Sequence, residues 1–194
     1  MIGKCSSWFC YEDEDLDFNS HENHLSWCVP EVEPIVRRNV PVKADHLAGT
    51  AAALARLPED WRDKLVRSTE RFVLSQCRYQ PVDRALDLAI AFEILTTGGK
   101  GDNAPPNWKV SVRSAQLIGG PLARRQHIRD LLGALYKIRN TGSHGGSLKA
   151  SEATEQDAVL GECGTIYQSL VDDVLAIGTG PVWSDLELEP RTRE

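Results

Sequence analysis

The sequence predicts an all-α fold, an antiparallel bundle of five or six helices with a peripheral N-terminal segment. Apolar residues recur at three- and four-residue spacing in several long windows, as on one face of a helix. Short clusters of glycine and proline separate these windows, as expected for turns. The sequence shows no convincing strand pattern, no alternation of strands with helices and no internal repeat. A helical bundle is therefore the expected architecture.

Length and composition predict one domain with tails. A chain of 194 residues with 41% hydrophobic content is long enough for a real core. We expect an N-terminal segment over residues 1–40 and a helical domain over residues 41–194. Five scattered cysteines, an odd number, do not form a disulfide framework, which favours a reducing compartment such as the cytoplasm. The sequence contains neither an eighteen-residue apolar run nor a secretory signal, so no association with a membrane is expected.

The N-terminal segment is acidic and rich in aromatic residues. Residues 1–36 hold eight acidic residues and one basic residue, Lys4. Two interpretations follow from this composition: the segment shields a basic region of its own chain or of a partner, or its aromatic residues dock on the body or pair as short extended segments. Those aromatic residues are Trp8, Phe9, Phe18 and Trp27. The segment also holds residue types that bind zinc, but their spacing fits no familiar finger, so no metal site is predicted. These residues are Cys5, Cys10, His21, His24 and Cys28.

Three helices are expected in the first half of the helical domain, over residues 44–57, 59–78 and 81–97. Pro58 ends the first of them, and Pro81 fits the first turn of the third. Packing positions in the first two helices are expected to be Ala51, Ala52, Leu54, Leu57, Trp61, Leu65, Phe72 and Val73. The third helix is the most apolar, with hydrophobic residues on every side. We therefore expect it to lie at the centre of the bundle.

Glu93 is the only charged residue between Leu88 and Leu95 of this apolar helix. A carboxylate buried there needs a partner, because an unpaired buried charge is costly. We expect a structural ion pair, for which Arg113 is a candidate partner. Two alternatives are that Glu93 reaches solvent at the helix end and that it takes part directly in chemistry.

A loop and a short helix are expected after the third helix, and a long helix with a short tail is expected near the C-terminus. Residues 98–107 are expected to form a loop; their Gly-Gly-Lys-Gly string lacks the spacing of a phosphate-binding loop. Residues 108–118 predict a short helix, although Val-Ser-Val alone would also suit a strand. Residues 152–177 predict the long helix, with an apolar stripe of Val159, Cys163, Ile166, Leu170, Val174 and Ile177. The tail after it is expected to fold back through Trp183, Leu186 and Leu188.

The most informative stretch is residues 121–146. Its first twenty residues predict a helix whose buried face consists of Ile128, Leu131, Leu132, Leu135 and Ile138. Gly142 is the expected stop. Arg139 follows Leu135 by four positions, so we expect it to be half-buried, while His144 follows in a glycine-rich turn. A fixed guanidinium beside an accessible imidazole suits phosphate chemistry. The simpler alternative is that Arg139 caps its helix and His144 is an ordinary turn residue.

Basic residues are concentrated in the same part of the chain. Residues 109–149 contain one acidic residue, Asp130, and eight basic ones: Lys109, Arg113, Arg124, Arg125, Arg129, Lys137, Arg139 and Lys149. Such a stretch can bind a polyanion locally although the net charge is −6. Alternatively, these are the solvated charges that any long helix carries.

Four segments, in this order, resemble those of the HEPN domains, and within them the Apea-like group. They are A-F-E-I-L, S-V-R-S-A-Q-L-I, Y-K-I-R-N-T-G-S-H-G and P-V-W-S-D-L. The resemblance covers roughly residues 60–190 and implies a HEPN-like bundle that forms a homodimer. The spacer Thr141-Gly142-Ser143 is more polar than the apolar residues common there in this group.

The resemblance implies a metal-independent endoribonuclease that needs no cofactor, a toxin or anti-phage defence effector that cuts tRNA or mRNA. In active members, two Arg-x4-His motifs meet at the dimer interface and the 2′-hydroxyl of RNA is the nucleophile, which leaves 2′,3′-cyclic phosphate ends. The implied roles are catalytic for Arg139, His144 and Asn140, supporting for Glu93, Arg113 and Tyr136, and RNA-binding for Arg124, Arg125, Arg129 and Lys137. An antitoxin or other regulatory partner is compatible with this interpretation. The alternative is a non-catalytic HEPN module for dimerisation, RNA binding or sensing; a DNA-binding regulator has only the basic stretch in its favour.

Overall fold

The computed structural model describes residues 44–97, 104–143, 150–189 and 191, and these residues confirm the all-α prediction. They form seven helices and no strand. The helices are α1 (Ala44–Arg56), α2 (Glu59–Cys77), α3 (Pro81–Thr96), α4 (Pro106–Ile118), α5 (Leu122–Ser143), α6 (Ala150–Ile177) and α7 (Trp183–Leu188). The residues predicted as an N-terminal segment lie outside this described part.

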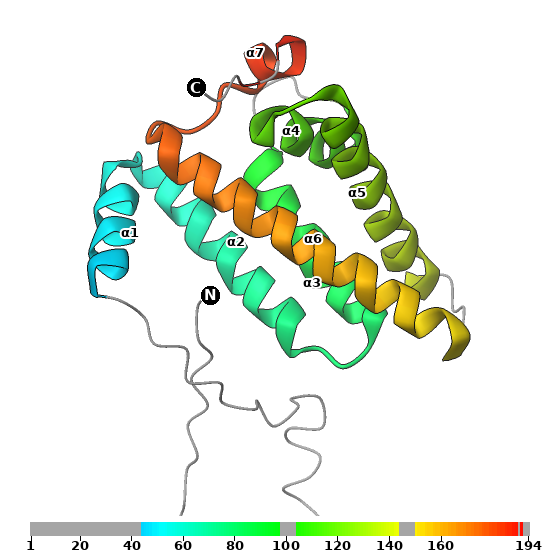
Figure 1. Ribbon diagram of the computed structural model, residues 1–194. Coiled ribbons are helices and arrows are strands. Elements are labelled where there is room, and N and C mark those ends of the chain that lie inside the picture. Colours follow the sequence, from blue (N-terminus) through cyan, green and yellow to red (C-terminus); the bar gives the residue numbers. More distant parts are fainter. Residues whose placement is uncertain (1–43, 98–103, 144–149, 190, 192–194) are drawn as a thin grey trace, which may run out of the picture.

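Helix α3 lies at the centre of the bundle, as its sequence predicts. It packs against α2, α4, α5 and α6, and α1 and α5 lie on opposite sides of the central helices (Figure 1). Six apolar α3 side chains are no more than 1% exposed, namely Ala85, Leu88, Ala89, Ala91, Phe92 and Leu95. Every member of the predicted α5 face is also buried, and so are Cys163, Leu170 and Val174 of the predicted α6 stripe. These helices pack through the faces that their apolar spacing predicts.

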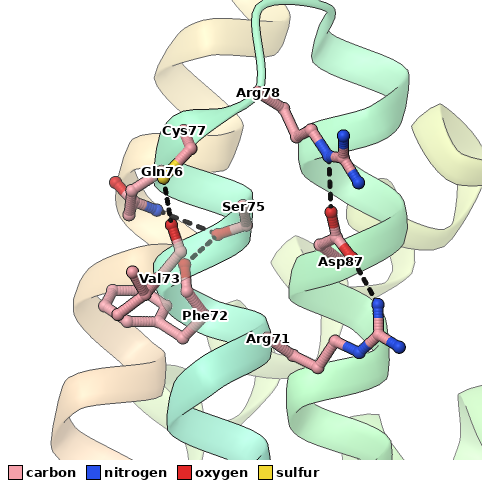
Figure 2. A network of polar contacts seen from close by, with 8 residues as sticks. All are labelled: Arg71, Phe72, Val73, Ser75, Gln76, Cys77, Arg78 and Asp87. Carbon is pink, nitrogen blue, oxygen red and sulfur yellow. Dashed lines mark hydrogen bonds and ion pairs between the residues drawn. The ribbon is translucent and has the colours of Figure 1, made fainter. Parts of the chain in front are cut away.

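A buried carboxylate ties the end of α2 to the start of α3. The Asp87 side chain is 4% exposed and lies between two arginines (Figure 2). Arg71 Nη1 donates to one of its oxygens at 3.1 Å and Arg78 Nε to the other at 2.9 Å. Two guanidinium partners offset the cost of removing this charge from water. The ion pairs fix the α2–α3 hairpin from which α3 enters the core.

Several local expectations are wrong for identifiable physical reasons. Ala51 and Ala52 are exposed, because the core contacts here are made by Leu54 of α1 and by Leu57, which follows the helix. Helix α4 begins at Pro106, inside the expected loop, because proline at the first helical position needs no hydrogen-bond acceptor. In the tail, Trp183 and Leu186 pack on the core as expected, but Leu188 is 84% exposed at the end of α7.

Helix α5 also differs from its prediction at its C-terminal end. It continues through Gly142 to Ser143, so Gly142 does not end it. A glycine within a helix costs only about 1 kcal/mol relative to alanine, and the packing of the preceding turns can outweigh this cost. Between α4 and α5, Gly119 and Gly120 adopt positive φ values of 67° and 94°.

We expect Gly180→Ala to lower the free energy of unfolding by about 1–3 kcal/mol. Gly180 has φ of 80°, and a Cβ atom there would overlap the indole ring of Trp61. Chemical denaturation would measure the change. Gly161→Ala in α6 is the matched control, since a Cβ there meets nothing within 4 Å. It should be neutral or stabilise by about 0.5–1 kcal/mol, and equal effects of the two substitutions would contradict the packing described here.

Alkaline pH should destabilise the fold through Cys163. Burial and the neighbouring Glu162 charge raise the pKa of this thiol to about 12, whereas an unfolded cysteine has a pKa of about 8.5. The unfolded state therefore loses its proton first, and stability falls between about pH 9 and 12, by up to about 1.4 kcal/mol per pH unit. Between about pH 9 and 12, the free energy of unfolding should fall less steeply with pH in Cys163→Ala than in the wild type. An unchanged slope would contradict this assignment.

No helix in the described part of the chain is long and apolar enough to cross a membrane.

Candidate functional site

The candidate site is a cluster of three polar side chains from α3 and α5. Glu93 lies in the last turn of α3, and Tyr136 and Arg139 lie three positions apart on α5, so they point to the same side of that helix. The Tyr136 hydroxyl donates a hydrogen bond to Glu93 Oε1 at 2.8 Å. Arg139 Nη1 donates to the same oxygen at 2.7 Å. The three side chains therefore form one hydrogen-bonded unit between two core helices.

Glu93 and Arg139 are partly shielded from solvent. Their side chains are 22% and 27% exposed, which confirms the expected half-buried position of Arg139 and the expected ion pair of Glu93. The guanidinium carbon of Arg139 also lies 5.4 Å from the centre of the Tyr136 ring, within the range of a cation–π contact. Two neighbours thus hold the guanidinium, one by charge and one by its aromatic ring.

The Tyr136 hydroxyl stays protonated in this setting. Burial raises the pKa of Tyr136 strongly, and its hydrogen bond to Glu93 and the negative charge of Glu93 raise it further. The nearby Arg139 charge lowers the pKa but does not outweigh those effects. Tyr136 is therefore a hydrogen-bond donor that orients Glu93 at neutral pH, and it is not a candidate proton acceptor.

The sequence suggested Arg113 as the partner of Glu93, and this pairing is wrong. Arg113 lies on α4, is 5% exposed and donates to the Thr96 carbonyl at 2.6 Å. It also pairs with Glu187 of α7 at 2.7 Å and lies 5.5 Å from the Trp183 ring centre. Arg113 thus satisfies a carbonyl at the C-terminal end of α3, one turn from Glu93, and ties α7 to that end. It supports the scaffold of the site, whereas Glu93 pairs with Arg139.

Of the other predicted catalytic residues, only Asn140 is described. Its side chain is exposed on α5, next to Arg139. Thr141 Oγ1 donates to the Lys137 carbonyl at 2.9 Å, within the helix. His144 lies immediately after the last described residue of α5, outside the described residues. The structure thus brings Glu93, Tyr136 and Arg139 together and carries the helix to the residue that precedes His144.

The exposed basic surface is smaller than the sequence suggests. Lys109 and Arg113 are only 6% and 5% exposed, so they cannot contribute to it. Of the predicted RNA-binding residues, Arg124 and Lys137 are exposed on α5. Arg129 is exposed and pairs with Asp130 at 3.2 Å. Arg125 is partly buried and donates to Gln116 at 2.8 Å.

Two residues that support the site were not predicted from the sequence, Thr96 and Glu187. The Thr96 carbonyl accepts from Arg113 like any helix-terminal carbonyl, which no side-chain pattern reveals. Glu187 lies four positions after Trp183 on one face of α7, and both contact Arg113. That spacing is the only signal in the sequence, and it is weak in a helix this short.

The described residues contain no group of three or more His, Cys, Asp or Glu side chains that could hold a metal ion. The cysteines and histidines considered for zinc all belong to residues 1–40, outside the described part. The site described above consists instead of one carboxylate, one phenol and one guanidinium. Comparison of the chain with models of known protein families, with curated proteins and with solved structures gives no match.

Proposed function

We propose that the protein is a metal-independent endoribonuclease of the HEPN type, active as a homodimer. The observation that carries the proposal is the position of Arg139. Glu93 and Tyr136 hold its guanidinium at a half-buried place, five residues before His144. This arrangement fixes a positive charge on the helix that leads, five positions later in the sequence, to a histidine. It fits the resemblance of the Arg-x4-His segment to the HEPN motif.

In the proposed reaction, a 2′-hydroxyl of RNA attacks the adjacent phosphorus. The bond from phosphorus to the 5′-oxygen breaks, which leaves a 2′,3′-cyclic phosphate and a 5′-hydroxyl. His144 moves a proton as general acid or base, a role suited to a group that titrates near neutral pH. Arg139 stabilises the negative charge that develops on the phosphoryl oxygens, and Asn140 supplies a further polar group. Such an electrostatic contact contributes roughly 3–4 kcal/mol to a transition state.

Glu93 has a positioning role in this proposal. A guanidinium has five N–H donors in a rigid plane, and the bond to Glu93 is made through Nη1. Glu93 can therefore orient the plane of the guanidinium in the proposed reaction. Arg113 supports this arrangement indirectly, because it binds the Thr96 carbonyl at the end of α3.

Exposed residues of α5 would hold the RNA backbone. Arg124, Arg129 and Lys137 extend over about 20 Å of helix and, at 3.6 residues per turn, point to different sides of α5. An RNA strand that contacts all three would therefore curve around the helix. Contacts along such a length would touch several phosphates, so binding would weaken as salt concentration rises. With tRNA or mRNA as substrate, the protein would act as a toxin or anti-phage effector, which an antitoxin or other regulatory partner would restrain.

One observation favours a second candidate function, a non-catalytic HEPN module for dimerisation, RNA binding or sensing. The ion pair with Glu93 neutralises much of the Arg139 charge. A purely structural pair would have the same geometry. In that case the cluster would stabilise the α3–α5 contact, and α5 would only bind.

Incubation of total cellular RNA with the wild-type protein in EDTA separates these functions. The proposed nuclease should produce discrete fragments that end in 2′,3′-cyclic phosphate and begin with 5′-hydroxyl. Intact RNA after incubation with a well-folded dimer would contradict the nuclease and favour the binding module. Cleavage that requires added Mg²⁺ and leaves 3′-hydroxyl ends would exclude this mechanism.

A further inference from the structure

An apolar groove lies between α1, α2 and α6, away from the site described above. Its lining includes Leu54 of α1, Val66, Val73 and Leu74 of α2, and Leu175 of α6, and its volume is about 640 Å³. Ligand pockets in proteins typically measure about 300–1,000 Å³. Val66 and Leu74 remain 48% and 39% exposed. The groove thus exposes apolar side chains to solvent. It is also large enough to hold several side chains of a binding partner.

The groove is separate from the proposed RNA site. No residue of α5 lines it, and α1 and α5 lie on opposite sides of the central helices (Figure 1). Its lining is almost entirely apolar, apart from two threonines and Glu70. Such a surface does not suit a polyanion, because nothing in it offers positive charge to phosphates. It suits an apolar segment of polypeptide.

We propose that residues 25–36 of the same chain, Leu-Ser-Trp-Cys-Val-Pro-Glu-Val-Glu-Pro-Ile-Val, dock in this groove. Residues 25–36 are joined through residues 37–43 to Ala44, the first residue of α1. Helix α1 forms one wall of the groove. Thr50, the first α1 residue in the lining, is six positions into the helix, roughly 9 Å from its start. Residues 37–43 can span up to about 25 Å when extended. The segment is therefore within reach of the groove.

The chemistry and length of the segment match the groove. Six of its twelve residues are large and apolar: Leu25, Trp27, Val29, Val32, Ile35 and Val36. Pro30 and Pro34 disfavour a helix, and an extended chain places Leu25, Trp27 and Val29 on one side. These three then span about 13 Å. The lining of α2 runs from Leu65 to Leu74, nine positions or about 13.5 Å of helix.

Covalent connection favours this occupant over a second copy of the chain. A short linker gives a tethered segment an effective concentration in the millimolar range. A separate molecule at micromolar concentration would need far more contact area to compete. Docking in cis also covers apolar side chains that a monomer would otherwise leave in water.

Site-specific photocrosslinking in the full chain tests the proposal. p-Benzoylphenylalanine replaces Leu74, and in a second protein Val66; both positions are partly exposed, so the fold should tolerate the probe. After irradiation, mass spectrometry of proteolytic peptides should show crosslinks to residues 25–36. A mixture of isotopically light and heavy copies should give crosslinks within one copy only. Trp27→Ala should reduce their yield at least several-fold, whereas Phe18→Ala should not.

A probe at Leu188, which is 84% exposed at the end of α7, serves as the control and should give no crosslinks to residues 25–36. Circular dichroism would confirm that each protein is helical. Crosslinks from the groove to residues 1–24 or between light and heavy copies would overturn the proposal. The absence of crosslinks from a folded protein would overturn it too.

Discussion

Substitution of Arg139 by alanine should lower RNA cleavage by about 10²–10³-fold. In the proposed reaction, its guanidinium stabilises charge on the phosphoryl oxygens, and alanine removes that charge. Glu93 and Tyr136 hold the guanidinium in advance, so no reorganisation is needed during the reaction. Initial rates on a defined RNA in EDTA would measure the loss.

Arg139→Lys separates the catalytic contribution of Arg139 from its structural one. Lysine keeps a positive charge near Glu93 but lacks the planar set of donors that matches a phosphate. We expect most of the stability to remain and cleavage to fall at least tenfold. If the alanine variant stays folded and cleaves RNA at the wild-type rate, Arg139 has no catalytic role.

Glu93→Ala should lower the free energy of unfolding by about 2–4 kcal/mol. Loss of one partner from a buried ion pair typically costs about 3–5 kcal/mol, and the 22% and 27% exposure of this pair reduces that figure. The substitution leaves the Arg139 guanidinium without its carboxylate and the Tyr136 hydroxyl without its acceptor. Cleavage should fall as well, because the guanidinium is no longer held in place.

The control for Glu93→Ala is Asp130→Ala. Asp130 also pairs with an arginine, Arg129, but their side chains are 70% and 57% exposed. Solvent-exposed pairs contribute about 0–1 kcal/mol, so this variant should unfold almost like wild type. Chemical denaturation of both variants would show the contrast, and a change below 0.5 kcal/mol for Glu93→Ala would show that the cluster does not stabilise the α3–α5 contact.

Apolar periodicity predicted much of the fold because burial decides helix orientation. The α5 face from Ile128 to Ile138 and the central place of α3 both followed from spacing. The half-burial of Arg139 followed as well, since it continues the row after Leu135. Positions with weak preferences were less predictable. Alanine at 51 and 52 fits a buried or an exposed site equally well, and Gly142 is compatible with a helix end or a helix interior.

The three residues of the cluster, Glu93, Tyr136 and Arg139, were named from the sequence, but their pairing was not. The need of Glu93 for a partner was evident from its apolar surroundings. Which arginine would meet it depends on how α3, α4 and α5 pack, and spacing within one helix carries no such information. Arg113 is twenty positions from Glu93 and Arg139 is forty-six, yet the packing of α3 on α5 selects the more distant one.

The most direct test of the proposed function compares wild type with His144→Ala in EDTA, with cleavage rate, melting temperature and oligomeric state measured on the same samples. The proposal predicts cleavage by the wild type and a loss of at least 100-fold in the variant. It also predicts that both proteins remain folded and dimeric with similar melting temperatures. Wild-type cleavage rates in a folded His144→Ala variant would contradict the assignment of His144, and with it the proposed nuclease mechanism.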